Sequence, residues 1–243
     1  MSNSLQYTGV RSFAFIPKKQ GVTDDEFAAY WHRVEPQRSG ALADAAGMSQ
    51  SLLLAEKVDN SPRLFNGVIE AWDKAQSAAD LQRALSTPEK IYDESARFMD
   101  LDHIVVLSGV ENIVQWGPAH IDLKKILRAL WVVTRKPGMS LEAFQDHWRH
   151  IHAPLVPRTP SMVRYIQYHV SERRSGAGMP QFDGVAELSW NNLEEYSESW
   201  QSYQMQHEQF PDMPNFLDLT RIAGGFFQEI WRSASICPTI LRA

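Results

Sequence analysis

The sequence has almost no cysteine, no long apolar run and no excess of positive charge. Its single cysteine, Cys237, cannot form a disulfide within the chain, which is typical of proteins in reducing compartments. No stretch approaches the roughly 20 apolar residues of a membrane helix, and residues 1–19 lack the apolar run of a signal peptide. The formal net charge of −5 argues against a nucleic-acid-binding surface. We therefore expect a cytoplasmic protein that binds neither membranes nor nucleic acid.

Several motifs of well-known enzyme classes are also missing. The chain has no P-loop and no Gly-x-Gly-x-x-Gly element, so nothing indicates nucleotide binding. Gly-x-Ser-x-Gly is absent, and Cys237 near the C-terminus is poorly placed for a nucleophile. His147, His150 and His152 form a His-x-x-His-x-His pattern, but His150 should point away from the sheet. Because no further ligand spacing completes the pattern, we predict no metal site.

What the chain does contain is an internal repeat with a constant offset of 117 positions. This offset pairs Gly21 with Gly138, Phe27 with Phe144, Trp31 with Trp148, Gln50 with Gln167, Gly67 with Gly184 and Glu70 with Glu187. A repeat of this length is the size of a domain, which excludes a solenoid of short units. We therefore expect two domains, residues 1–118 and 119–243, related by duplication.

Both halves show the same order of hydrophobic patterns, β-α-β-β-α-β, which is that of the ferredoxin-like unit. In the second half we predict strands at 128–134, 162–171, 181–190 and 226–231, with helices at 140–151 and 193–206. In the first half we predict strands at 10–17, 48–57, 64–72 and 103–110, with helices at 23–34 and 76–85. Two such sheets would pack their remaining apolar faces together. The predicted fold class is α+β, with two ferredoxin-like repeats forming one barrel within the chain.

The histidines are distributed unevenly between the halves. Five of the eight lie between His147 and His207, and a cluster of three spans residues 147–152. At the positions equivalent to His152 and His169 the first half has Glu35 and Leu52. We therefore expect the working site in the second half, with the first half as a degenerate scaffold. For His147, next to the apolar stripe of its helix, a pocket role and a buried structural role both stay open.

Two predicted strands carry further polar candidates. Tyr165, Gln167 and His169 alternate and so share one face, which is too polar for a simple core. Gln167 has the equivalent Gln50, so a structural role in both halves is an alternative. On the next strand Asp183 and Glu187 share a face. A partly desolvated Glu187 would have a raised pKa and could pair with a histidine, whereas a salt bridge to an arginine such as Arg164 would lower it.

The second half resembles the EthD family of the dimeric α+β barrel superfamily. The resemblance is carried by Phe-Gln-Asp-His-Trp-Arg-His-Ile-His-Ala-Pro-Leu-Val at 144–156, Tyr-Ile-Gln-Tyr-His-Val at 165–170, Asp-Gly-Val-Ala-Glu-Leu at 183–188 and Phe-Leu-Asp at 216–218. It implies a pocket for an aromatic or polyketide-like molecule, acid–base chemistry without a tightly held cofactor, and a catalytic role for the histidine at position 152. The fold alone does not decide the reaction.

We therefore expect a cofactor-independent acid–base enzyme of the lyase, dehydratase or cyclase type that acts on a hydrophobic substrate. His152 is the predicted general acid or base, with His169 and Glu187 as further catalytic candidates. The predicted substrate-binding residues are His147, Trp148, Tyr165, Gln167 and Asp183. A cofactor-free monooxygenase and a non-catalytic binding protein are the alternatives, and assembly into a homodimer stays open.

Overall fold

The computed structural model describes residues 10–33, 47–54, 63–73, 91–117 and 125–232. The predicted helix at 76–85 lies outside the described residues, as does most of the predicted boundary after Gly117.

The first half contributes four strands and two helices to the described structure. The strands are β1 (Val10–Ile16), β2 (Gly47–Leu53), β3 (Gly67–Asp73) and β4 (Val105–Gln115), and the helices are α1 (Asp24–Arg33) and α3 (Ile91–Phe98). A short 3₁₀ turn, η2 (Leu101–His103), precedes β4. The Thr23 side chain and Glu26 form a capping box at the start of α1.

The second half has the same strand count and more helical structure. Its strands are β5 (Leu127–Val133), β6 (Arg164–Ser175), β7 (Gly184–Trp190) and β8 (Ala223–Arg232). Its α-helices are α4 (Leu141–His147), α5 (Leu193–Gln201) and α6 (Phe210–Phe216). Two π-helical turns, η3 (Trp148–His152) and η5 (Met205–Gln209), and two 3₁₀ turns, η4 (Ala153–Arg158) and η6 (Leu219–Arg221), complete it.

The eight strands close into one antiparallel barrel in the order β1-β3-β2-β8-β5-β7-β6-β4, so the predicted α+β barrel within one chain is confirmed. Each half supplies four neighbouring strands in equivalent order, β4-β1-β3-β2 and β8-β5-β7-β6. The halves join where β2 pairs with β8 and β4 pairs with β6. That the halves are tandem copies of one ancestor stays a prediction.

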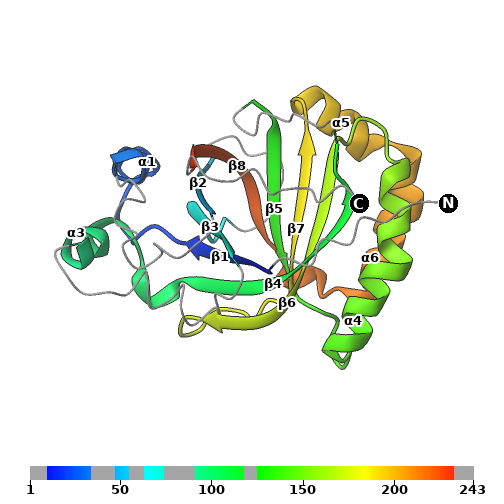
Figure 1. Ribbon diagram of the computed structural model, residues 1–243, viewed down its shortest axis with the longest axis horizontal. Helices are drawn as coiled ribbons and strands as arrows, with labels where there is room; N and C mark the ends of the chain where they lie inside the picture. Colours follow the sequence, from blue (N-terminus) through cyan, green and yellow to red (C-terminus); the bar gives the residue numbers. More distant parts are fainter. Residues whose placement is uncertain (1–9, 34–46, 55–62, 74–90, 118–124, 233–243) are drawn as a thin grey trace.

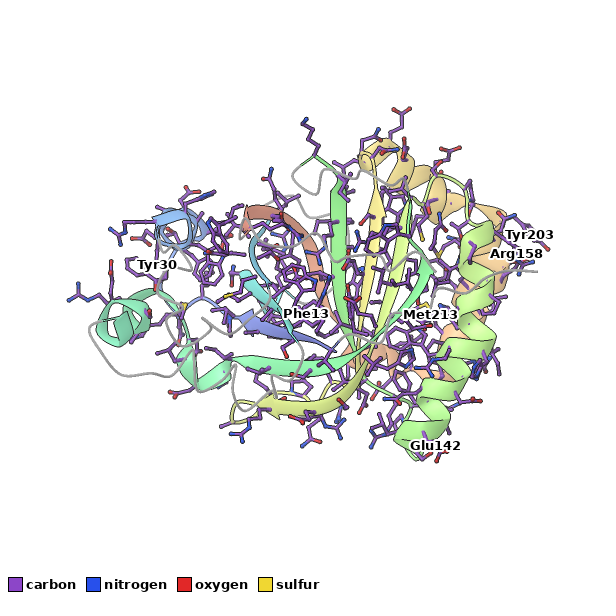
Figure 2. All side chains as sticks on the ribbon, in the orientation of Figure 1. Phe13, Tyr30, Glu142, Arg158, Tyr203 and Met213 are labelled. Atoms are coloured by element: carbon purple, nitrogen blue, oxygen red, sulfur yellow. The ribbon has the colours of Figure 1, made fainter. Side chains whose placement is uncertain are left out.

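The helices lie outside the barrel, at opposite ends of the long axis of the molecule. Helices α1 and α3 lie beside the first-half strands, and α4, α5 and α6 lie beside the second-half strands (Figure 1). In Figure 2, Phe13 marks the barrel interior near the centre, and Tyr30 lies on α1. The helical layer beside β5–β8 therefore belongs to the second half alone.

One hydrogen bond occurs in each half between residues that are related by the 117-residue offset. The side-chain amide of Gln50 donates to the backbone carbonyl of Trp31 at 2.7 Å, and that of Gln167 donates to the backbone carbonyl of Trp148 at 2.9 Å. In both cases a glutamine on a strand holds the helix that crosses it. These residues, which the 117-residue offset pairs, thus occupy equivalent positions in the two halves.

The barrel interior differs from the apolar interface that we expected. One part is apolar and aromatic, and includes Phe13, Phe15, Tyr168 and Phe182. The other part is a buried ionic cluster of three arginines and three glutamates: Arg11, Glu70, Glu111, Arg128, Arg164 and Glu187. These side chains alternate with apolar ones along their strands, so they share the inward face.

Candidate active site

A cavity of about 480 Å³ lies between the outer face of the second-half strands and the helices that cover them. Met213 on α6 lies in this layer and lines the cavity (Figure 2). Most of the lining is aromatic or aliphatic, with Trp131, Trp148, Tyr165, Trp200, Phe210 and Phe216 supplying the rings. Among the described residues that line it, none is Asp, Glu, Lys or Arg. The cavity thus suits an uncharged, largely apolar molecule, and its volume lies in the usual range for ligand sites.

His152 lines this cavity and is held by a carboxylate behind it. Its Nδ1 lies 3.0 Å from Oδ2 of Asp212, and the residue is 7% exposed. Because an ionised carboxylate can only accept a hydrogen bond, Nδ1 carries the hydrogen. The neutral ring then has its lone pair on Nε2, the arrangement of a general base oriented by a carboxylate.

A π-helical turn brings His152 to this position. The N–H of Ala153 bonds to the carbonyl of Trp148, five residues earlier, instead of four as in an α-helix. The wider turn leaves Ile151 52% exposed and turns His152 inward. A regular α-helix over the predicted range 140–151 would place Ile151 on the buried stripe and His152 outside it, and the π-turn reverses both.

Asp212 also binds the second predicted histidine, His147. Nε2 of His147 lies 2.9 Å from Oδ1 of Asp212, and Asn215 donates to the same oxygen at 3.2 Å. Burial opposes the negative charge of Asp212, but the hydrogen bonds from His152, Asn215 and His147 outweigh it and lower its pKa to about 2. His147 stacks on Phe216 at 4.9 Å between ring centres. Unlike His152, His147 does not line the cavity; it supports Asp212.

Sequence reasoning missed Asp212, because it missed the helix that carries it. Pro211 and Pro214 flank this residue, and prolines usually end helices. Here Pro211 occupies the first turn of α6, where a missing N–H is tolerated, so the helix forms. The available signal was the spacing of Phe210, Met213 and Phe216, which places three apolar side chains on one face of a helix.

Tyr165 contributes a hydroxyl group to the side of the cavity that the strands form. Its hydroxyl oxygen accepts from the indole Nε1 of Trp148 at 2.9 Å and from the amide of Gln167 at 3.1 Å. Burial raises the pKa of Tyr165, and the two donated hydrogen bonds only partly oppose this effect. Tyr165 and Trp148 line the cavity, whereas Gln167 lies behind them.

One known protein family matches the part of the chain that carries these site residues. Residues 136–220 match the family model of the EthD domain. By this match the segment resembles an EthD domain. It contains His147, Trp148, His152, Tyr165 and Asp212, so both histidines, their shared carboxylate and the tyrosine of the cavity wall fall within it. The resemblance that the sequence indicated is confirmed here.

Comparison with solved structures extends the similarity of fold to nearly the whole chain. An anthrone oxidase-like protein is 9% identical, with 95% of this chain and 94% of that chain covered and a TM-score of 0.62. A variant of chlorite dismutase from Candidatus Nitrospira defluvii is 12% identical, with coverages of 93% and 94% and a TM-score of 0.50. At these identities the comparison shows a shared fold. No protein of curated function matches the sequence.

His169, a catalytic candidate, lies behind the cavity and does not line it. Its Nε2 lies 3.1 Å from the side-chain oxygen of Gln167, and its ring packs against Trp148 at 5.0 Å. Burial lowers the pKa of His169 to about 3, with smaller contributions from Arg149 and His150. His169 is therefore neutral near pH 7 and supports the polar residues behind the cavity.

Glu187 does not meet a histidine, which corrects its predicted role. It lies on the inward face of β7, on the opposite side of the sheet from the cavity, and bonds to Arg128 at 2.9 Å and Arg164 at 3.0 Å. Burial opposes its charge, but neighbouring guanidinium groups outweigh it, so the pKa of Glu187 is lowered and not raised. The salt bridge to Arg164 that we considered as the alternative is present.

Asp183, predicted to bind substrate, also lies away from the cavity. It precedes β7 and pairs with Arg135 at 2.6 Å and with Arg173. These contacts connect the end of β5 to β6, so Asp183 stabilises the strand ends. It does not line the cavity.

Three further observations complete the description of the chain. His150 is exposed and pairs with Asp146 at 2.8 Å, as its helical position predicted. In the described part of the chain, no group of three or more His, Cys, Asp or Glu side chains is arranged to hold a metal ion. None of the described helices is long and apolar enough to cross a membrane.

Proposed function

We propose that the protein is an acid–base enzyme of the lyase, dehydratase or cyclase type that acts on an aromatic or polyketide-like substrate without a tightly held cofactor. The observation that carries this proposal is the His152–Asp212 pair at the wall of an aromatic cavity. Imidazole has an unperturbed pKa of about 6.5, which suits proton transfer near neutrality. The cavity supplies a binding surface for flat apolar molecules, and His152 supplies a base within it.

In this proposal each residue of the site has a distinct task. Nε2 of His152 removes a proton from carbon or oxygen of the substrate, and the ring becomes an imidazolium. Asp212 stabilises that cation through its 3.0 Å contact with Nδ1. His147 and Asn215 hold Asp212 in place from its other oxygen. The same imidazolium can then return the proton to a leaving group or to another atom of the substrate.

We further propose that the halves are tandem EthD-like copies, residues 1–118 and 119–243, of which only the second holds the active site. In the first half the residue equivalent to His147 is Tyr30, whose hydroxyl bonds to Ser95 at 2.7 Å. That hydrogen bond joins two hydroxyl groups and involves neither a carboxylate nor an imidazole. The single cysteine supports a cytoplasmic location, and a homodimer would be compatible with the closed barrel.

The proposal can be tested without the natural substrate, using anthrone, an aromatic ketone whose methylene group carries acidic hydrogens. Under nitrogen in deuterium oxide, wild-type protein should accelerate exchange of these hydrogens. His152→Gln should reduce the protein-dependent rate by about 10²- to 10⁴-fold, the usual contribution of a general base. His150→Gln is the matched control, because this neighbouring histidine is exposed and should change little.

Thermal unfolding of both variants separates chemistry from folding. Equal losses in the two variants, or a loss in His152→Gln that only follows unfolding, would mean that the histidine cluster is structural. Binding of anthrone without exchange above background would favour the non-catalytic binding protein.

An oxygen-dependent reaction is the second candidate, and the fold similarity to an anthrone oxidase-like protein is the observation that favours testing it. Proton removal by His152 would also produce the electron-rich anion that such a reaction needs. Turnover that starts only when O₂ is admitted, with one oxygen atom appearing in the product, would assign a monooxygenase. Product formation at equal rates under nitrogen and air would assign the lyase-type reaction.

A further inference from the structure

We infer that the Tyr165 hydroxyl donates a hydrogen bond to a substrate oxygen in the cavity that His152 also lines. This inference rests on the proposed function and narrows it to substrates with a carbonyl oxygen conjugated to the carbon that loses its proton. Such a substrate would accept from Tyr165 at the oxygen while His152 acts at the carbon.

The Tyr165 hydroxyl oxygen accepts hydrogen bonds from two side chains. Indole Nε1 of Trp148 can only donate, so Tyr165 Oη accepts from it at 2.9 Å. The amide nitrogen of Gln167 lies 2.9 Å from the Trp148 carbonyl and 3.1 Å from Tyr165 Oη, so its two hydrogens serve these two acceptors.

The contacts of the Gln167 side-chain oxygen support this orientation of its amide group. Its oxygen accepts from the amide nitrogen of Asn112 at 2.8 Å and lies 3.1 Å from Nε2 of His169. A flipped amide would place two donors against each other at Asn112, and two oxygens against each other at Trp148. Gln167 is therefore a donor to Tyr165.

A tyrosine hydroxyl can accept two hydrogen bonds and donate one. Tyr165 Oη already accepts two, and among the described residues no acceptor is bonded to its own hydrogen. The residue lines the cavity and is 3% exposed. A buried polar hydrogen with no partner is unfavourable, so this hydrogen is available to a ligand oxygen.

The first half shows that the hydroxyl is not required by the scaffold. There Trp31 Nε1 donates to the backbone carbonyl of Ser51 at 2.9 Å, and Met48 occupies the position equivalent to Tyr165. The glutamine–tryptophan contact is therefore formed without a tyrosine. In the second half, the same indole hydrogen is directed to a hydroxyl on the cavity wall.

This donor fits the proton transfer proposed for His152. When Nε2 takes the proton from carbon, the electron pair of the C–H bond moves through the conjugated system to the carbonyl oxygen. Tyr165 stabilises that oxygen by a hydrogen bond and keeps its own proton, because burial raises the pKa of the phenol. Return of the proton from the imidazolium restores the starting charges.

Two probes of nearly the same shape test the inference. Anthrone has a carbonyl group where 9,10-dihydroanthracene has a methylene. Wild-type protein should bind anthrone more tightly than 9,10-dihydroanthracene. Tyr165→Phe should weaken anthrone binding by about 2- to 12-fold, the range for one neutral hydrogen bond. The hydrocarbon should bind wild type and variant alike. Equal weakening of both probes would indicate altered packing and overturn the inference.

A second measurement needs no Tyr165 variant. In the wild-type complex, the infrared carbonyl band of anthrone should lie at lower frequency than in an apolar solvent. His152→Gln should retain that shift while losing proton exchange. An unshifted band overturns this inference and leaves the role of His152 intact, whereas wild-type protein that binds neither probe overturns both this inference and the proposed substrate class.

Discussion

At the residue scale, Asp212 connects the two histidines of the site. A carboxylate in this position would lose free energy on burial, yet three side-chain hydrogen bonds favour its ionised form and lower its pKa to about 2. The consequence for His152 is a defined tautomer, with the hydrogen on Nδ1. In the proposed reaction Asp212 thus orients the base, although it does not line the cavity.

The lowered pKa of Asp212 predicts a pH dependence of stability. Because the folded-state pKa lies below the reference value of 3.8, the stabilisation is complete well above pH 4 and is lost as the pH falls toward 2. The difference in free energy of unfolding between wild type and Asp212→Asn should therefore shrink between pH 5 and pH 2.5. Urea denaturation at several pH values measures it.

A matched control for this experiment is Asp146→Asn, which removes the carboxylate of the exposed pair with His150. Exposed ion pairs contribute about 0–1 kcal/mol, so this variant should stay close to wild type throughout. A wild-type–Asp212→Asn difference that does not change with pH would contradict the prediction.

At the scale of elements, the two π-helical turns shape the cavity. The turn η3 brings His152 inward, and η5 contributes Met205 and Gln209 to the opposite helical wall. Pro154 lacks the N–H that would continue the ladder after η3. A π-helical turn contains one more residue than an α-helical turn, so it changes which side chains face the sheet.

Deletion of Ile151 should convert η3 into an ordinary α-turn. The deleted side chain is exposed, and the Ala153 N–H can still bond to the Trp148 carbonyl, now four residues earlier. We expect an unchanged or higher melting temperature, because α-helical hydrogen bonding is restored. We also expect proton exchange on anthrone to fall to the level of His152→Gln, because the imidazole turns away from Asp212.

The substitution Ile151→Ala is the control, since it keeps the π-turn and should preserve both stability and exchange. If the deletion variant retained wild-type exchange, the wide turn would not be what positions His152.

At the scale of the whole molecule, the ionic cluster in the barrel joins the two halves. Arg128 bonds to Glu70 of the first half at 2.6 Å and to Glu187 of its own half at 2.9 Å. Arg11 lies 3.3 Å from Glu70 and 3.5 Å from Glu187. The two arginines are 117 positions apart, as are the two glutamates. Each half therefore supplies one arginine and one glutamate at equivalent positions, and Glu111 of the first half and Arg164 of the second complete the cluster.

Removing one charge from this network should destabilise the fold strongly. Glu187→Gln leaves buried guanidinium groups without a counter-charge, and loss of one partner of a buried pair typically costs about 3–5 kcal/mol. Urea unfolding should show this loss, while the exposed substitution Glu142→Gln should have little effect. Full stability of Glu187→Gln combined with lost proton exchange would instead return Glu187 to the active site.

Much of the fold follows from local patterns. Alternating side chains predict the strands, and the constant offset predicts two similar halves, because equivalent residues need equivalent neighbours. The same alternation places Tyr165, Gln167 and His169 on one face of β6 and Glu187 on the inward face of β7. Periodicity identifies a face but does not identify what covers it, so a histidine and an arginine both stayed open as the partner of Glu187.

The sequence by itself determined the barrel architecture, and it indicated the half whose described residues form the cavity and the histidine, His152, that lines it. Only the tertiary structure decided that Asp212, 60 positions further along the chain, lies behind His152. Such a contact depends on a helix that contains two prolines and on a turn with one extra residue. Both features arise because packing against the sheet outweighs local propensity, so no local pattern predicts them.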